Sequence, residues 1–349
     1  MSKNILFIAP LFMNIFEDVK TELVAQGYNV DFIPEGHYLE DPDNVRGYKG
    51  IKKILYVNPK KFQRRNSSKW KILLSETPFN KVYDILFVID GQSIPKNVFE
   101  ILRFRNPKLL AINYLFDTVK GVYRFDKNFS EYNKVYTFDK GESLLYGIRH
   151  LPIYWVKTSG KPTVEYDIFA FGRYSDIRLK LFKQIQRLSN ENHFKSFIKL
   201  ATDKEKNMPI VRVKWMIRKL LGKTKGHIAP SFYGDEMNTY ESISPQDFRS
   251  LILKSNVIVD TSAPHQDGLT ARFMWALGYG KKIITTNQSI KQYGFYNKNQ
   301  VYVVDDVDLI DANEINEFLR NELICLEEKQ KCLISRLELS NWINLLING

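Results

Sequence analysis

Residues 4–33 read NILFIAPLFMNIFEDVKTELVAQGYNVDFI and decide the fold. The run Ile5–Ala9 is continuously apolar, which is typical of a strand covered on both faces of a sheet. A helix from about Met13 to Ala25 follows it, Gly27 ends that helix, and Asn29–Ile33 supplies a second strand. Strand, helix and strand in this order predict a parallel pair, because parallel strands need a helical crossover.

The same alternation continues along the chain, apart from a polar stretch from Pro34 to about Pro78 that has no clear period. Further strands are expected at 84–89, 109–113, 134–138, 166–171, 256–260, 282–286 and 301–304. Helices are expected near 98–104, after a turn at Gly172 through about residue 187, at 270–277 and over 313–334. Pro152, Gly160 and Pro162 separate two series of elements. We therefore expect an α/β protein with two Rossmann-like, doubly wound domains, 1–155 and 156–349, facing a cleft.

Composition narrows the class of protein. A chain of 349 residues suggests about two domains, and 26% charged with 44% hydrophobic residues exclude a disordered or fibrous chain. Two cysteines cannot form a disulfide framework, and no apolar run reaches the roughly 18 residues of a membrane helix. Pro10 and Asn14 interrupt the N-terminal apolar segment, so it does not read as a secretion signal. We expect a cytoplasmic protein.

The net charge is +12, from 51 Lys and Arg against 39 Asp and Glu. Such an excess suits nucleic acid, anionic lipid or a phosphate-bearing substrate, although an ordinary lysine-rich surface gives the same balance. The sequence contains no RNA-binding or zinc-finger pattern, so nucleic acid is not an expected partner.

The most informative stretch runs from Asp260 to Asn287 and reads DTSAPHQDGLTARFMWALGYGKKIITTN. A strand ends at Asp260, and a helix begins near Thr270, whose hydroxyl suits an N-cap. Gly268 lets a ligand approach the backbone closely, and the N–H groups of the helix start, helped by Arg272, suit a phosphate or pyrophosphate. The alternative is an ordinary loop followed by a capped helix.

This stretch resembles the donor-binding half of GT-B glycosyltransferases, and more closely that of bacterial capsular polysaccharide and lipopolysaccharide transferases. The matching features are a Gln-x-Gly-Leu-Thr-x-Arg run at 266–272, an Ala-Leu-Gly-x-Gly-Lys-Lys run at 276–282 and the ending Thr-Thr-Asn at 285–287. Residues 113–117, 135–139 and 166–174 resemble other segments of the same group. The resemblance extends from about residue 84 to residue 304.

The resemblance implies a metal-independent glycosyltransferase that uses a nucleotide-sugar donor and no other cofactor. It makes 156–349 the donor-binding domain and 1–155 the acceptor side. It places donor contacts at Gln266, Gly268, Leu269, Thr270, Arg272, Arg173 and Arg178. Cations in such a site stabilise the charge of the departing nucleotide, so Arg272 is also a candidate catalytic residue. No close cluster of His, Asp and Glu demands a metal.

One position departs from the family pattern. Trp275 stands where the family has an acidic residue that typically holds the donor ribose, and an indole cannot accept hydrogen bonds from a diol. Either Trp275 contacts the donor in another way, or the chain is a catalytically degenerate GT-B-like protein that binds glycans or partner proteins. Nucleotide-sugar epimerases share the architecture, so the fold alone leaves their activity open.

Two carboxylates of the first domain are candidate catalytic residues. Asp90 closes an expected strand before Gly91, and Asp117 follows another. Either would deprotonate an acceptor hydroxyl if the enzyme inverts configuration, while a helix-cap or salt-bridge role is the alternative. The acceptor implied by the resemblance is a growing surface polysaccharide, as a glycan or a lipid-linked glycan.

The segment 206–234 contains no acidic residue. Pro209 suits a helix start, and one face of that helix would carry Ile210, Val213, Ile217, Leu220 and Leu221. The segment carries Arg212, Lys214, Arg218, Lys219, Lys223 and Lys225. Such a helix either rests peripherally on anionic lipid at the inner face of the cell membrane or packs its apolar face onto its own domain.

Overall fold

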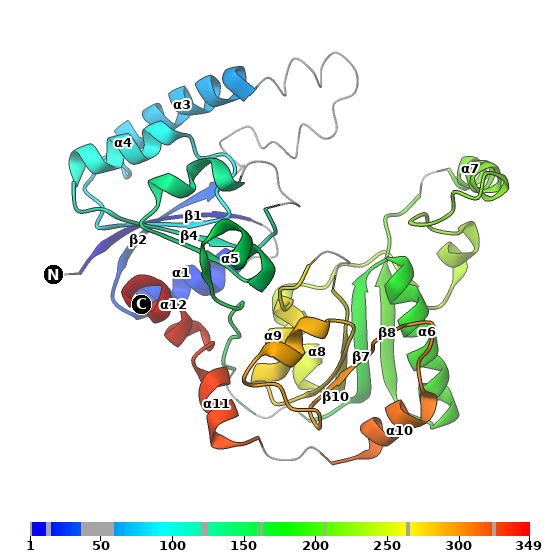
Figure 1. Ribbon diagram of the computed structural model, residues 1–349. Coiled ribbons are helices and arrows are strands. Elements are labelled where there is room, and N and C mark those ends of the chain that lie inside the picture. The colour runs from blue at the N-terminus through cyan, green and yellow to red at the C-terminus, as the bar shows by residue number, and fades with distance from the viewer. Residues whose placement is uncertain are drawn as a thin grey trace. The chain divides into compact units, whose positions relative to one another are not determined.

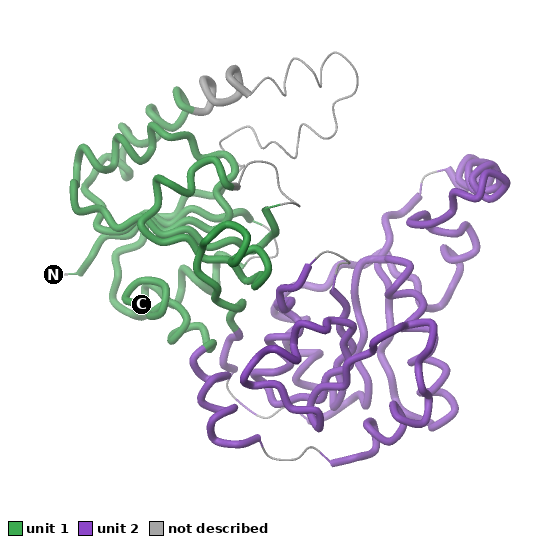
Figure 2. The backbone as a smooth tube through the Cα atoms, in the orientation of Figure 1, with its two compact units in different colours: residues 1–154, 337–349 green, residues 155–336 purple. Residues whose placement is uncertain are grey.

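The computed structural model describes residues 2–11, 15–35, 59–119, 125–158, 160, 163–205, 207–262, 266–322 and 326–349. The chain divides into two compact units, residues 1–154 with 337–349 and residues 155–336 (Figure 2). Each unit has one six-stranded sheet, and the paired strands run parallel. The expected pair of Rossmann-like α/β domains is confirmed.

The sheet of the first unit has the strand order β2-β1-β3-β4-β5-β6. Its strands are β1 (Asn4–Pro10), β2 (Asn29–Glu35), β3 (Ile85–Ile89), β4 (Leu110–Leu115), β5 (Lys134–Thr137) and β6 (Arg149–His150). All five residues of β3 are buried, because helices cover both faces of the sheet. Continuous apolar runs predicted most of these strands to within a few residues.

Helices lie on both faces of this sheet (Figure 1). They are α1 (Ile15–Ala25) and α12 (Leu339–Asn348) on one side, α3 (Pro59–Ser75) and α4 (Lys96–Arg105) on the other, with η3 (Phe125–Glu131) and α5 (Lys140–Tyr146) in the connections. Helix α3 was not predicted, because the stretch from Pro34 to about Pro78 has no clear period. Trp70 and Leu74, four residues apart, are buried and, with the partly buried Leu73, mark the core-facing side of residues 67–75 of that polar helix.

The C-terminus belongs to the first unit, which corrects the expected domain 156–349. The Trp342 ring packs edge-on against Tyr114 and Tyr154, with ring centroids 4.7 and 5.0 Å apart. Its Nε1 donates a hydrogen bond to the carbonyl of Pro152 at 3.0 Å. Lys134 Nζ donates to the last carbonyls of the chain, including that of Gly349 at 2.7 Å. These contacts cap α12 and hold it on the sheet.

The second unit has the strand order β12-β11-β10-β7-β8-β9. Its strands are β7 (Tyr166–Arg173), β8 (Ser196–Ala201), β9 (Asn238–Thr239), β10 (Ser255–Asp260), β11 (Lys282–Thr285) and β12 (Val301–Val303). Its helices are α6 (Asp176–Glu191), α7 (Met208–Leu220), η4 (Pro230–Gly234), α8 (Pro245–Leu253), α9 (Ala271–Gly278), η5 (Gln288–Gln292), α10 (Ala312–Arg320) and α11 (Glu328–Ser335).

The long helix expected over 313–334 is wrong, because the chain forms α10 and α11 instead. Lys282 Nζ donates to the carbonyls of Phe318 and Asn321 and so satisfies the end of α10. A capping box between Glu327 and Gln330 then starts α11. Local capping therefore divides the predicted helix.

Each sheet has a point where its strand order reverses. In the second unit the chain runs outward from β7 through β8 and β9, and then returns to place β10 on the other side of β7. In the first unit β2 and β3 lie on opposite sides of β1. Ligands of open α/β sheets bind outside the carboxyl ends of the strands at such points. Those edges are therefore where the candidate sites lie.

Candidate functional site

Arg178 joins the carboxyl ends of β7 and β10 in the second unit. Its Nε donates to Thr261 Oγ1 at 2.7 Å, and its Nη1 donates to the carbonyl of Arg173 at 2.8 Å. Its Nη2 lies 3.5 Å from the carbonyl of Thr261. These three bonds use three of the five N–H donors of a guanidinium, and all three acceptors are uncharged. Among the described residues, Arg178 has no carboxylate partner.

The charge of Arg178 persists at neutral pH. Burial and the neighbouring Arg272 lower its pKa to about 10, while Asp260 opposes that shift. A half-buried cation bonded to neutral oxygens at a sheet switch point is suited to an anionic ligand.

Gly172 makes room for this side chain. A Cβ at Gly172 would lie 3.1 Å from Arg178 Nε and 3.3 Å from its Cζ, so the guanidinium crosses the strand where no side chain stands in its way. Ser175 caps α6 by accepting a hydrogen bond from the backbone N–H of Arg178 at 3.3 Å, which fixes the start of the helix that carries the arginine.

Arg272 is held inside the unit. Its Nε forms an ion pair with Asp260 Oδ1 at 3.2 Å, Nη1 donates to the carbonyl of Phe171, and the guanidinium lies 5.7 Å from the Phe248 ring centroid. Asp260 is fully buried and also accepts a hydrogen bond from Thr270 Oγ1 at 2.9 Å. The structure thus gives Arg272 a bracing role beneath the strand ends, close to Arg178.

The loop before α9 is braced from the strand beside it. Asn287 Nδ2 donates to the carbonyl of Gly268 at 3.1 Å and to Ser262 Oγ at 2.8 Å. Leu269 is 1% exposed and belongs to the core, while Thr270 caps α9 by accepting from the N–H of Phe273. Gln266 is partly exposed and begins the described part of the loop.

Two expected donor contacts have other partners. Arg173 is exposed, and its Nη2 pairs with Asp203 Oδ2 at 2.5 Å. Trp275 is 2% exposed, and its ring packs against Phe248 and beneath the guanidinium of Arg249, 5.3 Å from its centroid. The structure corrects the expectation for Trp275: α9 turns this side chain toward α8, so the indole presents no face to a ligand.

Asp90 is the notable carboxylate of the first unit. It follows β3 with φ of +63°, an unusual backbone conformation for a residue other than glycine. Its Oδ1 accepts a hydrogen bond from the N–H of Phe116 at 2.8 Å, and Asn113 Nδ2 donates to its carbonyl at 3.0 Å. Burial, with the charges of Glu35 and Asp117, raises the pKa of Asp90 to about 8.

Glu35 was not predicted as a site residue, because the second strand was expected to end at Ile33 and extends to Glu35. Its carboxylate accepts hydrogen bonds from the N–H groups of Gly91 at 2.9 Å and Ser93 at 2.7 Å, and so fixes the loop that holds Asp90. Burial raises the pKa of Glu35. The position of Glu35 at the end of a strand beside the switch point was the available signal. Asp117 lies exposed after β4, near enough to act on Asp90.

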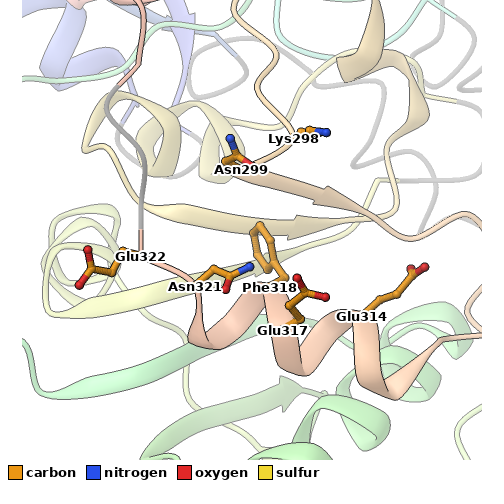
Figure 3. A pocket seen from close by; sticks show the side chains of 7 residues that line it. All are labelled: Lys298, Asn299, Glu314, Glu317, Phe318, Asn321 and Glu322. Carbon is orange, nitrogen blue, oxygen red and sulfur yellow. The ribbon is translucent and has the colours of Figure 1, made fainter.

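A pocket of about 410 Å³ lies elsewhere in the second unit (Figure 3). Glu314, Glu317 and Glu322 line it from α10 and the residues that follow. Lys298 and Asn299 complete it directly before β12, at the amino edge of the sheet. It is therefore at the opposite edge from Arg178 and takes no part in the candidate site.

The described parts of the chain contain neither a metal-binding cluster nor a membrane-spanning helix. No group of three or more His, Cys, Asp or Glu side chains in those parts is arranged to hold a metal ion. No helix among the residues that the structure describes is long and apolar enough to cross a bilayer.

No known protein-family model and no curated protein sequence matches this chain. The N-terminal domain of Candida albicans trehalose-6-phosphate phosphatase superposes with a TM-score of 0.57 at 12% identity, over 99% of this chain and 96% of that one. A UDP-forming α,α-trehalose-phosphate synthase from Burkholderia xenovorans superposes with a TM-score of 0.54 at 11% identity, over 99% of this chain and 98% of that one. The fold is of the GT-B type. Arabidopsis thaliana UGT89C1 in complex with UDP superposes with a TM-score of 0.51 at 8% identity, over 99% of both chains.

Proposed function

We propose that this protein is a glycosyltransferase that takes a sugar from a nucleotide-sugar donor. The observation that carries the proposal is Arg178, a half-buried cation bonded to Thr261 and Arg173 where the strand order of a GT-B-type unit reverses. Among the residues described, no carboxylate pairs with it. Two of the similar structures have names that refer to UDP, which makes UDP the first ligand to test.

In this proposal the second unit binds the nucleotide diphosphate. Arg178 directs its two remaining N–H donors to the phosphate oxygens, and Arg272 adds positive potential from beneath, braced by Asp260. Charge on the leaving phosphate develops in the transition state, so fixed cations there lower the barrier. No metal is required for this role, and the nucleotide sugar is a substrate, not a resident cofactor.

The first unit supplies the acceptor side of the proposed reaction. Asp90 is the candidate general base, because it is partly exposed at a carboxyl edge and its pKa of about 8 makes it a proton acceptor of useful strength. Asp117 is placed to influence it through charge. This assignment suits an inverting transfer, in which the base removes the proton of the attacking hydroxyl.

The finer parts of the proposal rest on the sequence resemblance. They are a surface polysaccharide as product, in a capsule, an exopolysaccharide or a lipopolysaccharide, and a glycan or lipid-linked acceptor. They also include a cytoplasmic place of action, in peripheral contact with the inner face of the cell membrane.

Ligand-dependent melting tests the proposal most directly. UDP, other nucleoside mono- and diphosphates and their sugar conjugates are added to the purified chain, and a bound ligand raises the melting temperature by mass action. We expect one nucleotide series to stabilise the protein and its nucleotide sugar to turn over with a glycan acceptor. Stabilisation without turnover for any sugar or acceptor indicates a degenerate binding protein. No stabilisation by any nucleotide contradicts the proposed donor site.

A further inference from the structure

Helix α7 turns its apolar face to solvent. Ile210, Val213, Ile217 and Leu220 share one side of the helix and are 49%, 57%, 53% and 86% exposed. No residue of α7 is buried. The expectation that this helix packs its apolar face onto its own domain is therefore wrong. A surface of this kind on a protein marks an interaction site.

The opposite side of α7 faces the unit. The least exposed residues are Met208, Val211, Trp215 and Arg218, at spacings of three and four that form one stripe. The main packing partner is η4, and the helix stands apart from the sheet of its unit (Figure 1). Asn207 caps the first turn, and Gly222 ends the helix with φ of +65°. The helix is thus fully formed, although it buries almost nothing.

Cations border the exposed apolar face. Arg212 and Lys219 lie on one side of the apolar stripe and Lys214 on the other, and Lys223 follows in the next turn. These four side chains are exposed and form no ion pair with any described residue. The segment from 207 to 234 has no carboxylate to offset them.

We infer that α7 binds an anionic membrane surface by inserting this apolar face, with the bordering cations at the lipid headgroups. The charge of the segment selects lipid, because a helix with an apolar face flanked only by cations matches an anionic bilayer interface. At about 1.5 Å per residue the helix covers about 20 Å of that interface. The inference adds a mechanism to the proposed peripheral contact and does not depend on the transferase reaction.

Vesicle sedimentation with two sets of substitutions tests this inference. The full chain is mixed with phosphatidylcholine vesicles containing half phosphatidylglycerol, or none. One variant combines Ile210→Ser, Val213→Ser and Ile217→Ser, and the other combines Arg212→Gln, Lys214→Gln, Lys219→Gln and Lys223→Gln. We expect binding to anionic vesicles only, falling about tenfold or more in the apolar variant and about fivefold per cation in the charge variant.

Two matched control variants carry the same kinds of substitution at exposed positions outside α7. Leu144→Ser, Leu145→Ser and Leu309→Ser replace exposed leucines, and Lys71→Gln, Lys108→Gln, Lys298→Gln and Lys329→Gln remove four exposed cations. Both control variants should lose much less binding. Retained binding in the apolar variant would overturn the insertion, because adsorption would then be electrostatic alone.

Sedimentation velocity without lipid tests whether a second copy of the chain, and not a membrane, covers the apolar face of α7. A wild-type dimer that becomes monomeric in the apolar variant, together with no vesicle binding, would show that α7 pairs with a second copy and would contradict the inference. The rise in melting temperature caused by UDP is measured in the same variants and should equal that of the wild type. If UDP does not raise the melting temperature of the wild type, the proposed donor site is refuted, and the vesicle result is not affected.

Discussion

Arg178 Nε donates a hydrogen bond to Thr261 Oγ1 at 2.7 Å and thereby links the start of α6, the helix that follows β7, to the residue that follows β10. The two strands belong to opposite halves of the sheet order, so this bond crosses the switch point itself. A ligand bound there meets a guanidinium that is already fixed. Such preorganisation lowers the cost of binding, because the side chain loses little further freedom.

Replacing Arg178 with Gln should weaken UDP binding by about 1.5–3 kcal/mol, the contribution of charge-assisted hydrogen bonds to a phosphate. Titration calorimetry on the folded variant measures the change. Arg187→Gln is the matched control, since it lies on the same helix, is exposed and pairs with Glu191 at 3.1 Å. A variant at Arg178 that binds UDP as tightly as the control would disprove the assignment.

Gly172→Ala should weaken UDP binding without removing any donor. The new Cβ would lie 3.1–3.3 Å from the Arg178 guanidinium and its Cδ, so the side chain must shift by a few tenths of an ångström. We expect a loss of about 0.5–1.5 kcal/mol in UDP affinity, the worth of one misaligned hydrogen bond, with nearly unchanged folding stability. Gly234→Ala, where a Cβ meets nothing within 4 Å, serves as the control. Equal affinities in the two variants would contradict the prediction.

The sequence predicted most strands of the two sheets but not the orientation of the site residues. Ile85–Ile89 and Ser255–Asp260 were predicted as strands because buried parallel strands are continuous apolar runs. Strand β8 was missed, because Lys199 interrupts its apolar pattern near the edge of the sheet. Such strands are defined by their neighbours as much as by their own residues.

The candidate site shows the same limit. The resemblance to GT-B enzymes predicted Arg173, Arg178 and Arg272 as phosphate contacts, and the place of Arg272 at a helix start supported the last of these. Their roles differ because Asp203 pairs with the first and Asp260 with the last, and neither pairing is visible in local sequence. Trp275 was placed by its position in a motif, but the packing of α9 on α8 decides which way it points.

Arg272 should matter for stability more than its motif suggests. Arg272→Met leaves the fully buried Asp260 without its ion-pair partner, and we expect the free energy of unfolding to fall by about 3–5 kcal/mol in urea denaturation. Adding Asp260→Asn should recover part of that loss, because it removes the unpaired charge. Arg173→Met, which breaks the exposed pair with Asp203, should cost less than about 1 kcal/mol. If the losses of unfolding free energy caused by Arg272→Met and Asp260→Asn simply add in the double variant, the two side chains are not coupled.

Asp90 should make folding stability depend on pH. Its pKa is raised from 3.8 to about 8 in the folded chain, so between these values the native state holds a proton that the unfolded state releases. The free energy of unfolding therefore falls as pH rises from about 4 to about 8. Because the side chain is partly exposed, water screens part of the effect, and we expect a total of about 2 kcal/mol.

Asp90→Asn removes this titration and keeps a residue that tolerates φ of +63°. Its stability should vary less between pH 4 and pH 8 than that of the wild type, as measured by urea unfolding at several pH values. Glu100→Gln, at an exposed position on α4, should retain the wild-type dependence. If Asp90 is also the general base, log kcat/KM of the wild type should rise with pH until about 8 and then level off, and the Asn variant should lose most turnover while still binding UDP. An Asn variant with the wild-type pH dependence of both stability and turnover would exclude Asp90 from both roles.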